Sequence, residues 1–134
     1  MSLEKAIQLA QASVPECIAV GYVDMNTGML LAVKTVDSHP SDILDLVAAA
    51  TADLFQGPTV VSIEKHFKRA RGVQQDETHY FQELAVFSTN LLHVFLRGKK
   101  HQNHATVFVC RASANVGMVL AKSRIALPSI EASL

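Results

Sequence analysis

The sequence lacks several features that would identify a specific chemistry. It has no tryptophan, and aromatic residues make up only 6% of it, which argues against an aromatic cage around a small ligand. Its two cysteines, Cys17 and Cys110, lie among apolar residues without metal-binding spacing, so we interpret them as reduced core thiols. Uninterrupted apolar runs such as MLLAV and TVFVC are short, and we expect no membrane-spanning segment.

The amino terminus also lacks the continuous apolar stretch of a signal peptide, because Glu4 and Gln8 interrupt it. We therefore expect a cytoplasmic protein. Apolar residues make up 49% of the 134-residue chain, which is enough for a sizeable core. We expect a single domain over residues 1–128 and a flexible carboxyl-terminal tail over residues 129–134, after Pro128.

The net charge of zero conceals an uneven distribution. Residues 1–64 carry two basic and eight acidic side chains, a net charge of −6, whereas residues 65–134 carry ten basic and four acidic ones, a net charge of +6. A nucleic-acid-binding domain would favour an overall basic chain, so this dipolar distribution indicates recognition of other proteins.

Apolar spacing and turn residues predict an α+β domain, a central five-stranded antiparallel sheet with flanking helices. Ser2 is the expected N-cap of the first helix, and Gly28 closes the first hairpin with a positive φ. Gly57-Pro58 interrupts the middle helix. The stretch after it is ambiguous, because TVVSI alone suits a strand while the longer pattern favours a helix. In chain order we expect a helix at 2–13, strands at 17–25 and 29–37, a middle helix opening at 39–42, a helix at 59–71, strands at 80–88, 91–97 and 105–111, and a helix at 114–127.

The segment RASANVGMVLAKSRIAL, residues 111–127, follows a strand and opens a helix, where many proteins bind phosphate. A nucleotide-binding loop needs several glycines and a lysine at fixed spacing, and here Gly117 stands alone inside the helix. We interpret Ser113 as the N-cap, with Asn115 in the first turn and Gly117 letting the helix lie close to the sheet. The segment is thus interpreted as a structural turn.

Other catalytic patterns are missing as well. RGKKH at residues 97–101 has neither the upstream glycine nor the following Ser or Thr of a P-loop, and no nucleophile-elbow sequence occurs. His101 and His104 form an incomplete set of metal ligands, and His93 suits a core or half-buried strand position. We therefore expect a protein that is not an enzyme and holds no cofactor or metal.

The middle helix carries the strongest signal for an interface. At about 100° per residue, its apolar side chains fill an arc of roughly 200°, wider than the roughly 100° that commonly faces a core. One sheet cannot cover so wide an arc, so we expect a homodimer in which this helix pairs with its own copy; the pattern leaves open which edge of the arc meets the sheet. Asp42, Asp45 and Asp53 form the solvated side of the helix. The expected interface residues are Leu44, Val47, Ala48, Ala50, Thr51, Leu54, Phe55, Leu84 and Val86.

Two basic stretches, KHFKRAR at 65–71 and RGKKH at 97–101, are the best candidates for a partner-binding patch. A nucleic-acid surface would add exposed aromatics, and only Phe67 qualifies, so a solvated helix face, an acidic protein and an anionic membrane surface stay as alternatives. The expected patch residues are Lys65, Lys68, Arg69, Arg71, Arg97, Lys99 and Lys100.

The segments CIAVGYVDMNTGMLLAV and VFVCRASANVGMVLAKSRIAL resemble the first hairpin and the closing strand, polar turn and helix of the roadblock (dynein light chain) family. The resemblance covers nearly the whole chain in topology, although Gly57-Pro58 and the long basic stretch after it depart from the family pattern. It implies a homodimer with a sheet extended across two chains, no catalytic residues, and a role in regulating a small Ras-like GTPase or in scaffolding motor or signalling complexes. It also implies the strand order second, first, fifth, fourth, third, which would bring Cys17 and Cys110 close together.

Two other classes of function stay open. PAS- and profilin-like small-molecule sensors share a five-stranded antiparallel sheet with flanking helices, but they need a cavity between the sheet and the helices. A nucleic-acid-binding protein would use the stretches 65–71 and 97–101 and would lose affinity steeply with salt. The sequence names no partner other than a second copy of the chain.

Overall fold

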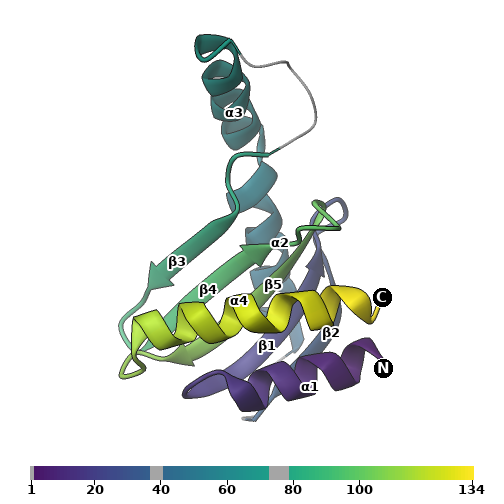
Figure 1. Cartoon of the computed structure of the whole chain (residues 1–134), viewed down its shortest axis with the longest axis vertical. Helices are drawn as coiled ribbons and strands as arrows, with labels where there is room; N and C mark the ends of the chain where they lie inside the picture. Colours follow the sequence, from purple (N-terminus) through teal and green to yellow (C-terminus); the bar gives the residue numbers. More distant parts are fainter. Residues whose placement is uncertain (1, 37–40, 73–78) are drawn as a thin grey trace.

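The structure is a computed structural model that describes residues 2–36, 41–72 and 79–134, with the side chains of residues 41–45 left out of the description. An open five-stranded antiparallel sheet carries helices on both sides, which confirms the predicted α+β class (Figure 1). In chain order the elements are α1 (Leu3–Ser13), β1 (Cys17–Asp24), β2 (Met29–Thr35), α2 (Ser41–Gln56), α3 (Pro58–Ala70), β3 (Glu83–Phe87), β4 (Leu91–Arg97), β5 (His104–Arg111) and α4 (Val116–Ala132).

The strands lie in the order β2-β1-β5-β4-β3, as the family resemblance implied. Cys17 on β1 is therefore the register partner of Cys110 on β5, and both are buried free thiols. The hydrogen bond to Cys17 and burial raise the pKa of the Cys110 thiol, so it stays protonated and unreactive at neutral pH. Gly28 closes the β1–β2 hairpin with a φ of 71°, as predicted.

Side chains alternate between two cores on the two faces of the sheet. Tyr22 and Phe108 face the core that α1 and α4 cover, whereas Phe95 and Val107 face the core beneath α2. Each buried Phe or Val contributes about 1.5–3 kcal/mol relative to an exposed one, so these cores hold the layers together. Figure 1 shows α1 and α4 in front of the sheet and α2 behind it.

The middle helix breaks where the sequence predicted, because Gly57 has an extended ψ of 163° and caps α3, with Pro58 in its first turn. The ambiguous stretch after the break is a helix. By length and composition alone, Leu46–Ala70 could cross a membrane, which the expectation of no spanning segment did not anticipate. That expectation considered only uninterrupted apolar runs, whereas polar residues interrupt the apolar ones in this stretch. Burial of Ala48 and Phe55 within the domain ties the first part of this stretch to the fold.

The last helix differs from its prediction at both ends. Asn115, not Ser113, caps it by accepting a hydrogen bond from the Met118 amide (3.0 Å), and Ser113 instead donates to Glu16. Gly117 is exposed and does not bring the helix close to the sheet. The turn before α4, which resembles a phosphate-binding site in sequence, is therefore a structural turn that caps the helix.

The helix also continues through Pro128 to Ala132 where the sequence predicted a flexible tail. Proline inside a helix is unfavourable. The Glu131 carboxylate compensates, because it is buried and accepts the backbone N–H groups of Lys99, Lys100 and His101 at 2.8–2.9 Å. Ile130 is fully buried as well, so the end of α4 is part of the core.

Candidate interaction surface

The side of α2 that is turned away from the sheet is apolar. Leu46 is 68% exposed and Leu54 is 40% exposed, and Ala50 between them is also exposed. Their spacing of four residues places them on one side of the helix. We call Leu46, Ala50 and Leu54 the outer stripe of α2.

The opposite side of α2 packs on its own sheet. Ala48, Thr51 and Phe55 are fully buried there, so their assignment to the dimer interface was wrong. These residues share one edge of the predicted apolar arc, and the sheet covers that edge. Val47 is half-buried, and the side chain of Leu44 lies outside the described residues.

Strand β3 forms one edge of the sheet, beside β4, and its outer side carries no strand partner within the described residues. Val86 is 41% exposed and Phe87 is 64% exposed, whereas Leu84 is half-buried. An exposed apolar edge strand readily pairs with another chain. The β3 edge and the outer stripe of α2 are the two apolar features that the predicted interface retains.

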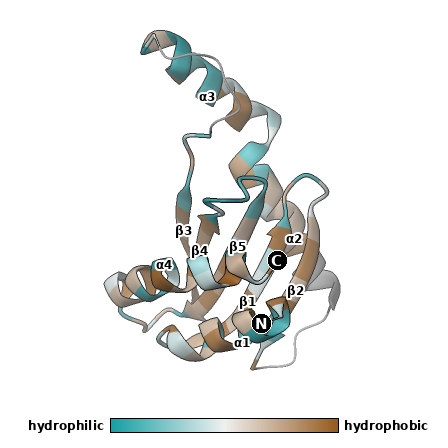
Figure 2. Ribbon diagram, turned by 45° about the vertical axis from the view of Figure 1, so that its right-hand side comes forward, coloured by the Kyte–Doolittle hydropathy of each residue, from teal (hydrophilic) through white to brown (hydrophobic). Residues whose placement is uncertain are grey.

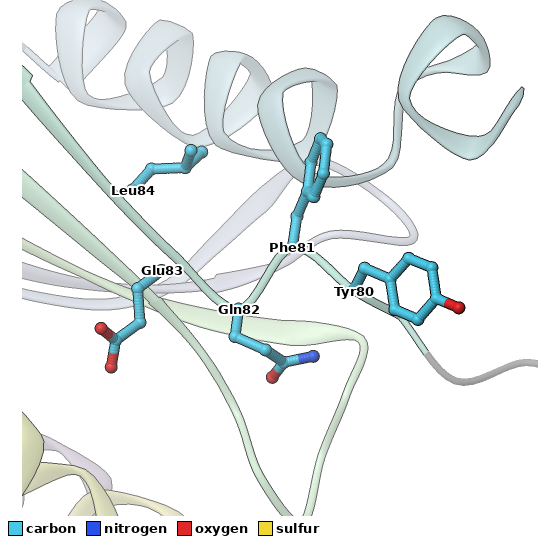
Figure 3. A pocket seen from close by; sticks show the side chains of 5 residues that line it. All are labelled: Tyr80, Phe81, Gln82, Glu83 and Leu84. Carbon is cyan, nitrogen blue, oxygen red and sulfur yellow. The ribbon is translucent and has the colours of Figure 1, made fainter. Parts of the chain in front are cut away.

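An open depression of about 410 Å³ lies at the start of β3. Five consecutive residues line it, Tyr80 to Leu84. Figure 3 shows the side chains of Phe81 and Leu84 directed toward the core beneath α2, with those of Gln82 and Glu83 directed away from it. Glu83 binds Arg124 of α4 in a bidentate contact of 2.7 and 3.0 Å, and this hydrogen bond lowers the pKa of Glu83. The first residue of β3 is thereby bound to α4, which covers the face of the sheet opposite α2.

The segment before β3 is held by a buried carboxylate on α3. Glu64 accepts hydrogen bonds from His79 Nδ1 (2.9 Å) and from the backbone amides of Tyr80 and Phe81 (3.4 Å for Phe81). Burial alone would raise the pKa of Glu64, but these hydrogen bonds together lower it. Residues 80–82 were predicted to be strand, but β3 begins only at Glu83, because the backbone amides of Tyr80 and Phe81 donate to Glu64 instead.

Arg97, expected in an exposed basic patch, is only 1% exposed. Its guanidinium donates to the backbone carbonyls of Phe55, Phe81 and Gln102 at 2.8–3.0 Å and lies 5.0 Å from the Phe55 ring. Burial lowers the pKa of Arg97, and the charge of Glu64 opposes this. The side chain therefore joins the end of α2 to the segment before β3 and to the β4–β5 loop.

The remaining basic residues do not form the predicted patch as a whole. Lys68 is buried, so its assignment to an exposed patch was also wrong. Lys65 and Arg69 are exposed on α3 and Arg71 is exposed at its C-cap, whereas Lys99 and Lys100 are exposed on the β4–β5 loop at the end of α4. The exposed basic residues thus divide between two elements.

Within the described residues, no cluster of three or more His, Cys, Asp and Glu side chains could hold a metal ion. His101 and His104 stack with ring centroids 5.4 Å apart, and His104 Nδ1 lies 2.9 Å from the Tyr22 hydroxyl. Burial lowers the pKa of His104 and raises that of Tyr22, which favours a neutral pair. His93 is half-buried, as predicted.

A second depression of about 420 Å³ lies between the β1–β2 turn, residues 25–28, and α2. It and the depression at Tyr80–Leu84 are open to solvent. Neither has the enclosed shape that a sensor of the PAS or profilin type needs between its sheet and its helices.

No protein-family model and no curated protein sequence matches the chain. Solved structures do. A roadblock/LC7 domain from Streptomyces avermitilis aligns with a TM-score of 0.67 at 13% identity, covering 98% of this chain and 97% of that one. The gliding protein MglB from Thermus thermophilus aligns with a TM-score of 0.70 at 16% identity, covering 98% and 87% of the two chains.

Profilin II from Acanthamoeba castellanii aligns less closely, with a TM-score of 0.61 at 10% identity and coverage of 99% and 100%. This wider likeness follows from the same five-stranded sheet between helices. At these identities the comparisons establish the fold of the chain. The two higher TM-scores, the strand order and the near-complete coverage agree with the sequence resemblance, and the chain has a roadblock-like fold.

Proposed function

We propose that this chain is a non-catalytic homodimeric regulatory or scaffold protein that binds a small Ras-like GTPase or a signalling complex. The observation that carries the proposal is the outer stripe of α2, with Leu46 and Leu54 uncovered on a helix whose other side is fully packed. Apolar area of this kind commonly marks an interface. The open β3 edge offers a second contact by which two sheets can join.

A second copy of the chain is the economical partner for both features, because a two-fold axis lets each stripe and each edge cover its own counterpart. MglB, with which the chain shares its fold, has been solved in a tetrameric arrangement. The small side chain of Ala50 at the middle of the stripe would allow two helices to approach closely. The proposed interface therefore consists of the outer stripe, Val47, Leu84 and Val86.

The structure supplies a matched pair of substitutions for the test. Ala50→Arg places a charge on the exposed side of α2, and Ala48→Arg places the same charge in the packed side, where Ala48 is fully buried. We expect Ala50→Arg to be a folded monomer and Ala48→Arg to unfold, because an unpaired buried charge is costly. Sedimentation velocity gives the mass and circular dichroism gives the folding. A wild-type protein that is monomeric at tens of micromolar would contradict the proposal.

The partner is tested separately. A purified Ras-like GTPase from the same organism, loaded in turn with GDP and a non-hydrolysable GTP analogue, is titrated into the protein in a calorimeter. We expect affinity to differ between the two nucleotide states, since the shape of such a GTPase changes with its nucleotide. The absence of binding to every GTPase tested would contradict a GTPase partner, and equal affinity for the two nucleotide states would contradict a role in regulating the GTPase.

A further inference from the structure

Helix α4 is apolar on two sides, and the rest of the chain covers only one of them. Val119, Leu127 and Ile130 are buried in the core between the sheet and α1. On the opposite side, Met118 is 46% exposed and Ile125 is 69% exposed. Figure 2 shows hydrophobic residues along the length of α4, whereas α3 is hydrophilic at its tip. Because a helix that is apolar all round is normally buried, the outer side of α4 indicates a covering partner.

The exposed apolar side chains of α4 follow a heptad spacing. Successive members are three, four, three and four residues apart, and each of them is exposed. This alternation is typical of the seam of a coiled coil, in which side chains of one helix fit between those of another. The small side chain of Ala121 leaves such a space between the larger Met118 and Ile125. We call five residues the α4 seam: Met118, Ala121, Ile125, Pro128 and Ala132.

Basic residues flank the α4 seam on both sides. At about 100° per residue, Lys122 lies about 60° to one side of Ile125 and Arg124 about 100° to the other. Both are exposed, and the side chain of Arg124 remains 55% exposed although it binds Glu83. The structure describes α4 from end to end, and its single acidic residue, Glu131, is buried with its carboxylate bound to the β4–β5 loop. The outer side of α4 therefore contributes only positive charge.

We propose that the α4 seam binds an amphipathic helix of another protein, one that carries acidic side chains beside its apolar stripe. Residues at the flanks of a coiled-coil seam select the partner by charge, and Lys122 and Arg124 occupy these flanks. The seam rises about 21 Å from Met118 to Ala132 at about 1.5 Å per residue, which is enough for about four turns of a partner helix. Because α4 and the outer stripe of α2 lie on opposite faces of the sheet, the inference goes beyond the proposed homodimer and does not depend on it.

The shape and charge of the α4 seam favour this partner over a membrane or a second copy. A helix that lies in a membrane surface needs a wide face of bulky apolar residues. The seam fills an arc of only about 80° and holds two large side chains, Met118 and Ile125. If two copies of α4 paired along the seam, Lys122 and Arg124 of one copy would face basic residues of the other, and like charges repel.

The test uses a synthetic peptide of about three heptads as the partner, with Leu at positions a and d and Glu at e and g. Its binding to the full chain is followed by fluorescence anisotropy of a dye on the peptide. We expect this peptide to bind about tenfold or more tightly than the same peptide with Lys at e and g, and added salt should shrink the difference. Equal binding of the two peptides, or none of either, would overturn the inference.

Substitutions place the binding on the α4 seam. Ile125→Ser should raise the dissociation constant of the Glu peptide about tenfold, because a large apolar contact is lost. The control Leu31→Ser, at a site on β2 that is 44% exposed, should leave the constant within about twofold. Lys122→Glu should weaken binding, whereas Arg69→Glu, with the same change of charge on the distant α3, should not.

The outcomes separate this inference from the homodimer and from the other occupants. If Ile125→Ser leaves peptide binding unchanged, the inference is overturned whatever the mass of Ala50→Arg. If Ile125→Ser lowers the mass of the protein in sedimentation velocity, the seam binds a second copy and the inference is wrong. It is equally wrong if the peptide does not bind while the wild type, and not Ile125→Ser, sediments with phosphatidylserine vesicles.

Discussion

The two faces of the sheet are covered to different extents. On one face, α1 and α4 together bury the central strands and also reach the outer strand β2, where Ala32 is only 9% exposed. On the other face α2 lies alone, and apolar residues on both outer strands stay exposed, with Val33 at 40% and Val86 at 41%. On the first face Phe87 of β3, the register partner of Leu92, is still 64% exposed, so that face is closed except over β3, whereas the second face is closed only in its middle.

This difference supports the proposed interaction surface more strongly than any single residue does. A helix about 10 Å across cannot cover five strands about 4.8 Å apart. The side chains left uncovered on the α2 face of the sheet and on the β3 edge are therefore consequences of one missing layer. In our account a second copy of the chain supplies that layer.

The largest expected effect comes from breaking the attachment of α2 to the sheet. Arg97→Met removes the donors to three backbone carbonyls, the buried one of Phe55 and the part-buried ones of Phe81 and Gln102. We expect a loss of about 3–5 kcal/mol in the free energy of unfolding, because the three carbonyls lose this donor at sites with little or no access to water. Urea denaturation measures the loss. Lys99→Met, at an exposed site two residues along, should change stability little, and equal losses for the two variants would contradict the structural role of Arg97.

A smaller effect concerns the segment that leads into β3. The folded state holds the pKa of Glu64 below its ordinary value of 4.5, so the unfolded state binds the proton more tightly. Glu64 therefore stabilises the fold above about pH 4.5, and this contribution is lost as the pH falls through the lower folded-state pKa. Urea denaturation between pH 7 and pH 3 should show the loss in the wild type and a shallower one in Glu64→Gln. Identical pH profiles for the two proteins would show that the carboxylate does not hold the segment.

Much of the fold could be predicted because local signals and packing agree. The hairpin at Gly28, the break at Gly57-Pro58 and the apolar alternation of the strands each followed from the backbone requirements of a few residues. The wide apolar arc of α2 was also present in the sequence. The sequence could not predict which edge of the arc packs on the sheet, because both edges are equally apolar. The burial of Ala48 and Phe55 shows that their edge does.

The polar residues were harder to place, because their roles depend on partners distant in the chain. Strand alternation puts Arg97 on the same side as Phe95, facing α2, and that signal could have excluded it from an exposed patch. No local pattern links Glu64 to residues 79–81 or Glu131 to the loop at Lys99–His101. For the same reason the sequence predicted that the last helix ends at Pro128. The helix in fact continues, because Glu131 binds a loop that is distant in the chain.

Hydrogen exchange of the β3 amides at two protein concentrations tests the central claim most directly. If a second copy covers the unclosed face, peptides spanning Glu83–Phe87 and the outer stripe of α2 should exchange more slowly at high concentration than after dilution below the dimer dissociation constant. Peptides spanning Leu91–Arg97, paired on both sides within one chain, should exchange alike at both concentrations. Exchange of the β3 amides that is fast and independent of concentration would contradict the account.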